Sequence, residues 1–360
     1  MEARRAGARK PRGSRSIWQV SLVFPDTMIA DTRYPTAVQR VEGLSRPGSE
    51  LWVKRDDRTH AIYGGNKVRK LEPILEDLRE HRVKRIVTVG AAGSHHVLAT
   101  THFGRQAGLE VEAVLVPQPR TGHVVDVLRA SLGQGLRAFP VGSWGAVPFA
   151  VARRVAAGAS FVQVGGSSVV GASGYVAAAR ELAAQVRAGE LPEPDVLVVA
   201  LGSGGTAAGL AAGLEAEGLA THVVGACVSV PPWALRLASQ ALARACTERA
   251  GVHGEAGARG ARARMKERLS MDVRFLGRGY GFSTSEGDDA TRDAREHAGL
   301  ALDPTYTSKA FACALWHVRA RRARHILYWH TLSSAPMAPL LEGAPEEREM
   351  GERLRGLVTP

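Results

Sequence analysis

Short runs of apolar residues alternate with longer helical patterns along most of this 360-residue chain. The runs lie at 85–90 (RIVTVG), 111–117 (VEAVLVP), 195–201 (DVLVVAL) and 222–230 (HVVGACVSV), and each precedes a glycine-rich or polar turn and a helix-like segment. Nearly continuous valine, isoleucine and leucine is typical of strands that are buried on both faces of a parallel sheet. The pattern therefore predicts an α/β fold, in which ligands bind beyond the carboxyl ends of the strands.

The size and composition of the chain agree with two α/β domains. Because 45% of its 360 residues are hydrophobic, the chain can form two cores that meet across a cleft. No apolar run approaches the roughly 18 residues of a membrane-spanning helix, so we expect no membrane partner. The three cysteines, Cys227, Cys246 and Cys313, are few and far apart. They indicate neither a disulfide framework nor a metal cluster, and they favour a cytoplasmic location.

The basic character of the chain does not point to a nucleic-acid partner. The net charge is +12, but 40 of the 47 basic residues are arginines spread through a sequence rich in alanine and glycine. Nucleic-acid binding needs a clustered basic face instead. Residues 1–33 begin with MEARRAGARKPRGSRS, where we expect a disordered tail rather than a transit peptide, because no amphipathic face is present. A second basic stretch, GEAGARGARARMKER from Gly254, is expected to form a surface insertion loop.

The turn after the run at 195–201 has the sequence of an anion-binding loop. It reads GSGGT and opens an alanine-rich helix; its residues are Gly202, Ser203, Gly204, Gly205 and Thr206. Unhindered amides at a helix N-terminus, together with a threonine hydroxyl, bind phosphate. The loop also matches a loose dinucleotide pattern, but the next strand ends without the acidic residue that a ribose requires. A phosphate monoester is therefore favoured over NAD, and a plain glycine turn is the structural alternative.

A lysine in the segment 64–72 (GGNKVRKLE) is the main candidate for covalent chemistry. Lys67 stands at the expected start of a helix, close to Arg69 and Lys70. A lysine that acts as an amine needs its ammonium form destabilised, and we expect the two neighbouring cations, the helix N-terminus and burial to lower its pKa. We therefore predict that Lys67 forms a Schiff base. The alternative is a solvated surface charge.

Several motifs in a fixed order give the chain a family resemblance. The segments KRDD, GGNKVRKLE, GGSSVVGASGY, GSGGTAAG, GRGYG, LDPTYTSKA and HT resemble those of the D-cysteine desulfhydrase and 1-aminocyclopropane-1-carboxylate deaminase family. This family is a branch of the fold-type II pyridoxal-phosphate enzymes related to the tryptophan synthase β subunit. The resemblance runs from about residue 34 to about residue 339.

The resemblance implies an architecture. It implies two open twisted α/β domains with pyridoxal 5′-phosphate in the cleft between them, and a homodimer. We expect a large domain at 34–71 and 171–342 and a smaller inserted domain at 72–170. Residues 1–33 and 343–360 are then tails.

The resemblance also implies a role for each candidate residue. Lys67 matches the Schiff-base lysine, and Ser94, Tyr280 and Tyr306 match catalytic residues that face the substrate. The residues implied to bind the cofactor are Lys67, Asn66, His95, Gly202, Ser203, Gly204, Gly205, Thr206, Thr307 and Thr331.

Departures from the family pattern bear on the activity. His95, in GSHH, replaces an asparagine that bonds the 3′ oxygen of the cofactor, and we expect this histidine to titrate near neutral pH. Leu332 and Ser333 replace glycines that let the backbone approach the cofactor ring. Thr307 replaces a glutamate of the deaminase branch, so the pyridine nitrogen stays largely unprotonated and β-elimination is favoured.

The resemblance therefore implies a lyase that deaminates a small amino acid. The expected reaction is that of D-cysteine desulfhydrase, which gives a 2-oxo acid and ammonia, and sulfide when cysteine is the substrate. Two alternatives stay open. One is ring opening of 1-aminocyclopropane-1-carboxylate, and the other is a paralogue that binds the cofactor without turnover.

Overall fold

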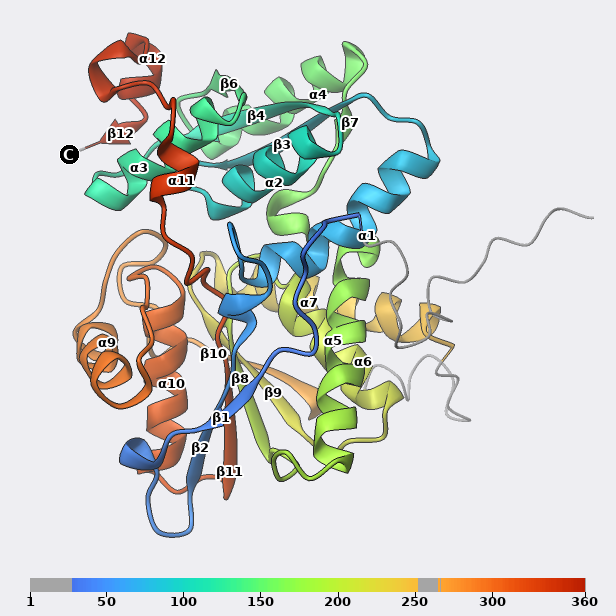
Figure 1. Ribbon diagram of the computed structural model, residues 1–360, viewed down its shortest axis with the longest axis vertical. Helices are drawn as coiled ribbons and strands as arrows, with labels where there is room; N and C mark the ends of the chain where they lie inside the picture. Colours follow the sequence, from blue (N-terminus) through green and yellow to red (C-terminus); the bar gives the residue numbers. More distant parts are fainter. Residues whose placement is uncertain (1–27, 252–264, 266, 360) are drawn as a thin grey trace, which may run out of the picture.

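The computed structural model describes residues 28–251, 265 and 267–359, and its two main sheets lie one above the other in Figure 1. The larger sheet has the strand order β1-β2-β11-β8-β9-β10, and all its neighbouring strands are parallel except β1 and β2. Its strands are β1 (Val38–Arg40), β2 (Glu50–Lys54), β8 (Val196–Leu201), β9 (His222–Cys227), β10 (Leu269–Asp272) and β11 (His325–Trp329).

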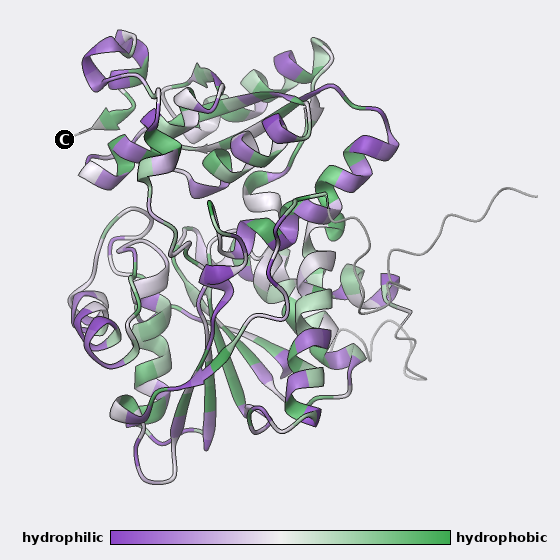
Figure 2. Ribbon diagram, in the orientation of Figure 1, coloured by the Kyte–Doolittle hydropathy of each residue, from purple (hydrophilic) through white to green (hydrophobic). Residues whose placement is uncertain are grey.

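Helices cover both faces of the larger sheet because its strands are apolar on both sides. Val198 and Tyr328 pack toward one layer of helices, whereas their neighbours Val199 and Trp329 pack toward the other. In Figure 2 the central strands β8 and β9 are largely green and the outer helix α9 is largely purple. The first layer is α9 (Ser285–Ala298) and α10 (Thr307–Arg319); the second is α5 (Val169–Arg187), α6 (Gly205–Ala216) and α7 (Pro232–Arg249).

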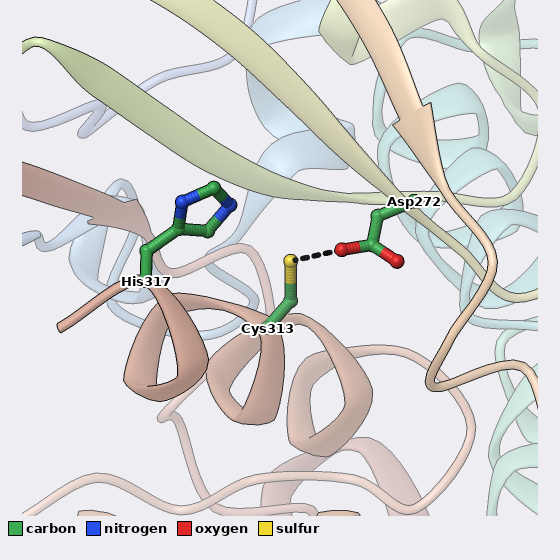
Figure 3. Close-up of side chains that lie close together, drawn as sticks. All are labelled: Asp272, Cys313 and His317. Atoms are coloured by element: carbon green, nitrogen blue, oxygen red, sulfur yellow. Dashed lines mark hydrogen bonds between the residues drawn. The ribbon is translucent and has the colours of Figure 1, made fainter. Parts of the chain in front are cut away.

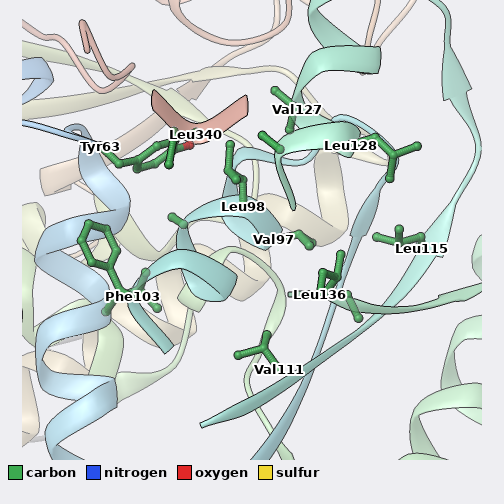
Figure 4. Close-up of a cluster of buried hydrophobic side chains, with 14 of the residues drawn as sticks. Tyr63, Val97, Leu98, Phe103, Val111, Leu115, Val127, Leu128, Leu136 and Leu340 are labelled. Atoms are coloured by element: carbon green, nitrogen blue, oxygen red, sulfur yellow. The ribbon is translucent and has the colours of Figure 1, made fainter. Parts of the chain in front are cut away.

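The smaller sheet is parallel throughout and has the order β6-β4-β3-β7. Its strands are β3 (Arg85–Ala91), β4 (Glu110–Val116), β6 (Arg137–Pro140) and β7 (Ser160–Phe161). On one face it packs against α1 (Asn66–Glu80), α2 (His95–Gln106) and α3 (Gly122–Gly133), and on the other against α4 (Val147–Ala156). Figure 4 shows part of the core between this sheet and helices α1, α2 and α3. This core includes Leu98 and Phe103 of α2, Val127 of α3 and Val111 of β4.

The four predicted apolar runs form β3, β4, β8 and β9, so the predicted α/β fold is confirmed. We propose that the two sheets mark the large and the inserted domain expected from the sequence. None of the helices in the part of the chain that the structure describes has the length and apolarity needed to cross a bilayer.

Both expected tails need correction within the described residues. Ile29 is only 2% exposed and belongs to the core of the smaller sheet, so the N-terminal tail cannot extend to residue 33. At the other end, Leu357 is buried and β12 (Val358–Thr359) pairs with β5 (Gln118–Pro119). The segment from 343 therefore folds onto the smaller sheet. Residues 1–27 and nearly all of the expected insertion loop lie outside the described residues.

Helix α1 joins the two sheets and crosses α5 at very close range. Gly174 of α5 makes this approach possible, because a Cβ atom there would lie 1.8 Å from the carbonyl oxygen of Arg69 in α1. The Arg69 side chain fixes the same crossing, since it donates to Asp56 at 2.9 Å and to Glu181 of α5 at 3.0 Å. The position of the first turn of α1 therefore depends on α5.

We predict that Gly174→Ala lowers the free energy of unfolding by about 1–3 kcal/mol, because the added methyl group forces α1 away from α5. Urea denaturation measures this change. Gly142→Ala is the matched control, since a Cβ atom at Gly142 meets no atom within 4 Å. Equal stability of the two variants would contradict the close crossing.

Candidate active site

All thirteen predicted site residues line one cavity of about 430 Å³. The smaller sheet contributes the turn after β3, with Ser94 and His95, and the larger sheet contributes the turn after β8, from Gly202 to Thr206. Carboxyl ends of parallel strands therefore meet at this cavity, as expected for an α/β fold. The roles that the sequence assigns to these residues stay predictions; their proximity is a finding.

The loop before α1 places Lys67 in the cavity. Gly65 adopts φ +91°, and a Cβ atom there would lie 2.5 Å from the carbonyl oxygen of Thr331. Only glycine fits this close approach without strain. The backbone amide of Asn66 then donates to the same Thr331 oxygen at 3.1 Å. The Lys67 Nζ atom donates to the side-chain oxygen of Asn66 at 3.0 Å. The lysine is thus fixed against the segment that follows β11.

Burial lowers the pKa of Lys67 to about 8, although the nearby Asp303 carboxylate opposes this effect. A substantial fraction of the amine is therefore neutral near physiological pH, which suits a nucleophile or base. The expected contribution of Arg69 is wrong, because the Arg69 guanidinium turns away to the carboxylates of Asp56 and Glu181. Burial and the charge of Lys67 also lower the pKa of Lys70, which lines the same cavity.

The GSGGT turn forms a glycine-rich loop at the N-terminus of α6. Gly204 has φ +87°, and a Cβ atom on it would lie 2.2 Å from the Ser239 hydroxyl oxygen, so a larger residue does not fit. The Ser203 hydroxyl pairs with that of Ser167 at 2.8 Å. The Thr206 hydroxyl accepts a hydrogen bond from the Asn66 side chain at 3.2 Å and keeps its own proton available. Amides and hydroxyls of this kind bind a phosphate.

Two tyrosines form a hydrogen-bonded pair across the cavity. Tyr306 donates to the hydroxyl of Tyr280 at 2.9 Å, and the rings meet edge to face. Burial raises the pKa of both phenols, so both stay protonated at neutral pH. Because Tyr306 gives its proton to Tyr280, the hydroxyl of Tyr280 is the one free to donate to a ligand.

Ser94 caps the N-terminus of α2. Its hydroxyl oxygen accepts a hydrogen bond from the Val97 amide at 3.4 Å. Gly90 leaves room beneath it, because a Cβ atom there would lie 2.5 Å from the Ser94 Cβ atom. The cap leaves the hydroxyl proton free to donate into the cavity, so capping and ligand binding are compatible.

Asp303 is a site residue that the sequence reasoning missed. It is buried, and its carboxylate accepts from the amides of Thr305 at 2.9 Å, Tyr306 at 2.7 Å and Thr307 at 3.1 Å. The available signal was the Asp303–Pro304 pair, because aspartate before proline favours a turn in which the carboxylate accepts from the following amides. Among the described residues that line the cavity, Asp303 is the only carboxylate.

The Thr307 hydroxyl is bound to Asp303. It donates to the carboxylate at 2.6 Å and accepts from the Asp303 amide at 2.7 Å. The hydroxyl proton of Thr307 is therefore not available to a ligand. One lone pair of the hydroxyl oxygen is left to accept a hydrogen bond. Four hydrogen bonds to Asp303, three from amides and one from Thr307, saturate this carboxylate.

The expectation that His95 titrates near neutral pH is wrong. Burial, and then the neighbouring His123, lower its pKa to about 4. Both ring nitrogens are occupied, because Nδ1 lies 2.7 Å from the Tyr63 hydroxyl and Nε2 lies 2.8 Å from Nε2 of His123. The role of Tyr63 and His123 was also missed, since no spacing links positions so far apart in the sequence.

The substitutions at 332 and 333 are accommodated at the cavity wall. Leu332 lines the cavity, and the Ser333 hydroxyl accepts a hydrogen bond from the Gly64 amide at 2.9 Å. Ser333 thus adds a second link between this segment and the loop before Lys67. Serine in place of glycine at position 333 thus provides a contact that helps to hold Lys67 in position.

A separate polar cluster lies away from the cavity, between β10 and α10. Figure 3 shows Cys313 directed at Asp272, with His317 one turn further along α10. The thiol donates to the Asp272 carboxylate at 3.4 Å, and the guanidinium of Arg274 forms an ion pair with this carboxylate. Because Arg274 already neutralises Asp272, we interpret the contacts among Cys313, Asp272 and Arg274 as structural; within the described residues, neither ring nitrogen of His317 has a hydrogen-bond partner.

The donor set of the cavity fits pyridoxal phosphate. The aldehyde of that cofactor needs a lysine amine, which Lys67 provides, and its phosphate needs amides and hydroxyls, which the loop from Ser203 to Thr206 provides. The lysine helix and the phosphate loop are joined directly by the hydrogen bond from Asn66 to Thr206.

Comparison with known proteins agrees with this chemistry. A family model described as pyridoxal-phosphate dependent enzyme matches residues 29–331. The chain is 32% identical to the nocardicin C-9′ epimerase of Nocardia uniformis subsp. tsuyamanensis, over 87% of this chain and 94% of that protein. It is also 32% identical to the D-cysteine desulfhydrase of Salmonella paratyphi A, over 82% and 91% of the two chains.

A solved structure extends the comparison to the fold. A crystal structure described as an ACC deaminase homologue superposes with a TM-score of 0.72 at 27% identity. The match covers 88% of this chain and 96% of the other. The two proteins therefore share one fold over most of their length.

We predict that Thr206→Val weakens pyridoxal-phosphate binding by roughly 10- to 150-fold, because one hydrogen bond to a charged group contributes about 1.5–3 kcal/mol. Equilibrium dialysis of the apoprotein with the cofactor measures the change. Thr101→Val is the control, since its buried hydroxyl donates to the Val97 carbonyl oxygen of α2 and not to the cavity. The same affinity in both variants would contradict the assignment of the loop.

Proposed function

We propose that this chain, which belongs to the family of pyridoxal-phosphate dependent enzymes, is a lyase that deaminates a small, cysteine-like amino acid by β-elimination. The observation that carries the proposal is the Lys67 amine, whose lowered pKa of about 8 leaves a fraction of it neutral, in one cavity with the glycine-rich loop and the Tyr280 hydroxyl. Cysteine and water would give a 2-oxo acid, ammonium and hydrogen sulfide.

Different residues of the cavity have different roles in this reaction. Lys67 and the loop from Ser203 to Thr206 would hold the cofactor. When bound, pyridoxal phosphate supplies an electron sink for the electrons left at the substrate α-carbon. The neutral Lys67 amine takes the proton from that carbon. Ser94 and Tyr280 each keep a free hydroxyl proton, and they bind the substrate carboxylate or protonate the leaving group.

The surroundings of Thr307 support elimination over cyclopropane ring opening. An acid beside the pyridine nitrogen would stabilise its protonated form and strengthen the electron sink. Asp303 is the one carboxylate among the cavity residues that the structure describes, and its hydrogen bonds with Thr307 and three amides already satisfy it. A weaker sink suffices when a good leaving group such as sulfide departs.

Epimerisation is a second candidate, favoured by the similarity to an epimerase over nearly its whole length. Proton removal from the α-carbon is common to both reactions, so the same Lys67 would serve either one. The reactions differ in the next step. Elimination expels a group from the β-carbon, whereas epimerisation returns a proton to the opposite face of the α-carbon.

The proposal includes two expectations from the sequence. Trp233 and Leu237 are both more than half exposed on one face of α7, and such a patch supports a homodimer. Free, buried cysteines at 227, 246 and 313 support a reducing, cytoplasmic compartment.

Incubation of the holoenzyme in D₂O with single enantiomers distinguishes these functions. Suitable substrates are D- and L-cysteine, β-chloroalanine, D-serine and 1-aminocyclopropane-1-carboxylate. We expect 2-oxo acid and ammonia in equal amounts, fastest from D-cysteine or β-chloroalanine. Deuterated amino acid of the opposite hand, without oxo acid, would instead establish an epimerase.

Lys67→Ala is the control, and it should abolish every reaction while the phosphate loop still binds pyridoxine phosphate. Ring opening of 1-aminocyclopropane-1-carboxylate as the fastest reaction would contradict the argument from Thr307. A holoenzyme that exchanges no α-proton of cysteine, β-chloroalanine or serine, and that releases no oxo acid from 1-aminocyclopropane-1-carboxylate, would be a cofactor-binding paralogue without turnover, and the proposed function would be wrong.

A further inference from the structure

Three side chains form a continuous hydrogen-bonded chain at one wall of the cavity. The Tyr63 hydroxyl lies 2.7 Å from Nδ1 of His95, and Nε2 of His95 lies 2.8 Å from Nε2 of His123. Both distances are short enough for proton transfer along the bond. The centroids of the two histidine rings lie 4.9 Å apart, so the two imidazoles are in direct contact.

The two ends of this chain lie in different environments. Tyr63 is 3% exposed and lines the cavity, and burial, followed by the nearby Asp303 carboxylate, raises the pKa of its phenol. His123 stands in the first turn of α3 and is exposed to solvent. Half-buried His95 joins them, so the chain of hydrogen bonds leads from the cavity wall to the outside.

The neutral state of the His95 ring suits proton transfer rather than the storage of a positive charge. Its pKa is about 4, because burial, His123 and Lys67 disfavour the cation more than Asp303 favours it. At neutral pH the ring is therefore neutral, with one nitrogen that donates and one that accepts. An asparagine at this position, as in the related family, has no such pair of exchangeable sites.

We propose that Tyr63, His95 and His123 form a proton relay that carries protons between solvent and the substrate in the cavity. The inference rests on the proposed function, because β-elimination leaves a carbon that must gain a proton to become the methyl group of the 2-oxo acid. Tyr63 is the group that faces the substrate, and the two histidines act through it.

One proton enters the cavity in each cycle. Solvent protonates Nδ1 of His123, whose Nε2 proton then moves to Nε2 of His95. The Nδ1 proton of His95 moves to the Tyr63 oxygen, and Tyr63 passes its own hydroxyl proton to the carbon. In the resting state this hydroxyl proton has the His95 carbonyl oxygen, at 3.1 Å, as an alternative acceptor. All three side chains end neutral, and the two imidazoles have exchanged tautomers.

His123→Gln separates the relay from a structural role. Glutamine can donate a hydrogen bond to Nε2 of His95, but it cannot take up one proton and release another. His123 is exposed and does not line the cavity, so the fold and cofactor affinity should not change. His81→Gln is the control, because this exposed histidine lies at the C-terminal end of α1 and its ring interacts with Asp77 rather than with the cavity.

We expect kcat of His123→Gln to fall at least about tenfold, which is less than the loss when a direct acid or base is removed. KM and cofactor affinity should stay as in the wild type, and added imidazole should restore part of kcat by supplying the missing proton carrier. The solvent isotope effect on kcat should rise in the variant. Unchanged kcat and isotope effect, or a loss that imidazole does not rescue, would overturn the relay.

NMR of ¹⁵N-histidine-labelled holoenzyme tests the relay without turnover. The ring nitrogens of His95 and His123 should show scalar coupling through their hydrogen bond, and their shifts should change together with pH. The groups that act on His95 are His123, Lys67 and Asp303, and Tyr63 is its other hydrogen-bond partner. Absence of this coupling overturns the relay even if no substrate is found, whereas coupling without turnover refutes only the proposed function.

Discussion

The position of the reactive lysine depends on a buried cluster of charges beneath it. Arg69, two residues after Lys67, is held by the carboxylates of Asp56 and Glu181, and Lys54 pairs with the same glutamate. Asp56 also accepts hydrogen bonds from buried aromatic side chains of α5 and β11. Desolvation makes such a cluster costly, and loss of one partner leaves an uncompensated buried charge. The chain therefore has one favourable position for the start of α1.

From this anchor the cavity is assembled by contacts between segments far apart in sequence. The start of α1 meets the segment after β11 through Thr331 and the phosphate loop through Thr206. The Asp303 carboxylate then orders the turn that leads into α10, and this turn includes Tyr306. Each contact serves both folding and chemistry, because the group that satisfies a backbone amide also orients a side chain toward the ligand.

Much of this could be predicted from sequence because the signals are local. Apolar runs predicted the strands, and glycines before Lys67 and around Ser203 predicted close backbone approaches. Partners joined only in three dimensions could not be predicted. Arg69 was expected to act on Lys67, but its partner Glu181 lies 112 residues away. Neither the role of Asp303 nor the contact between His95 and His123 has a periodic signature, and both change the expected electrostatics of the site.

The most direct test of the account is to identify the lysine that captures pyridoxal phosphate and the pH at which it does so. Apoprotein is mixed with the cofactor over a range of pH, reduced with borohydride, digested and analysed by mass spectrometry. Because burial lowers the pKa of Lys67 to about 8, the adduct should lie on Lys67, and its rate of formation should rise through pH 8 and then level off. An adduct on another lysine, or a rate that keeps rising toward the pKa of about 10.4 of an exposed lysine, would contradict the account.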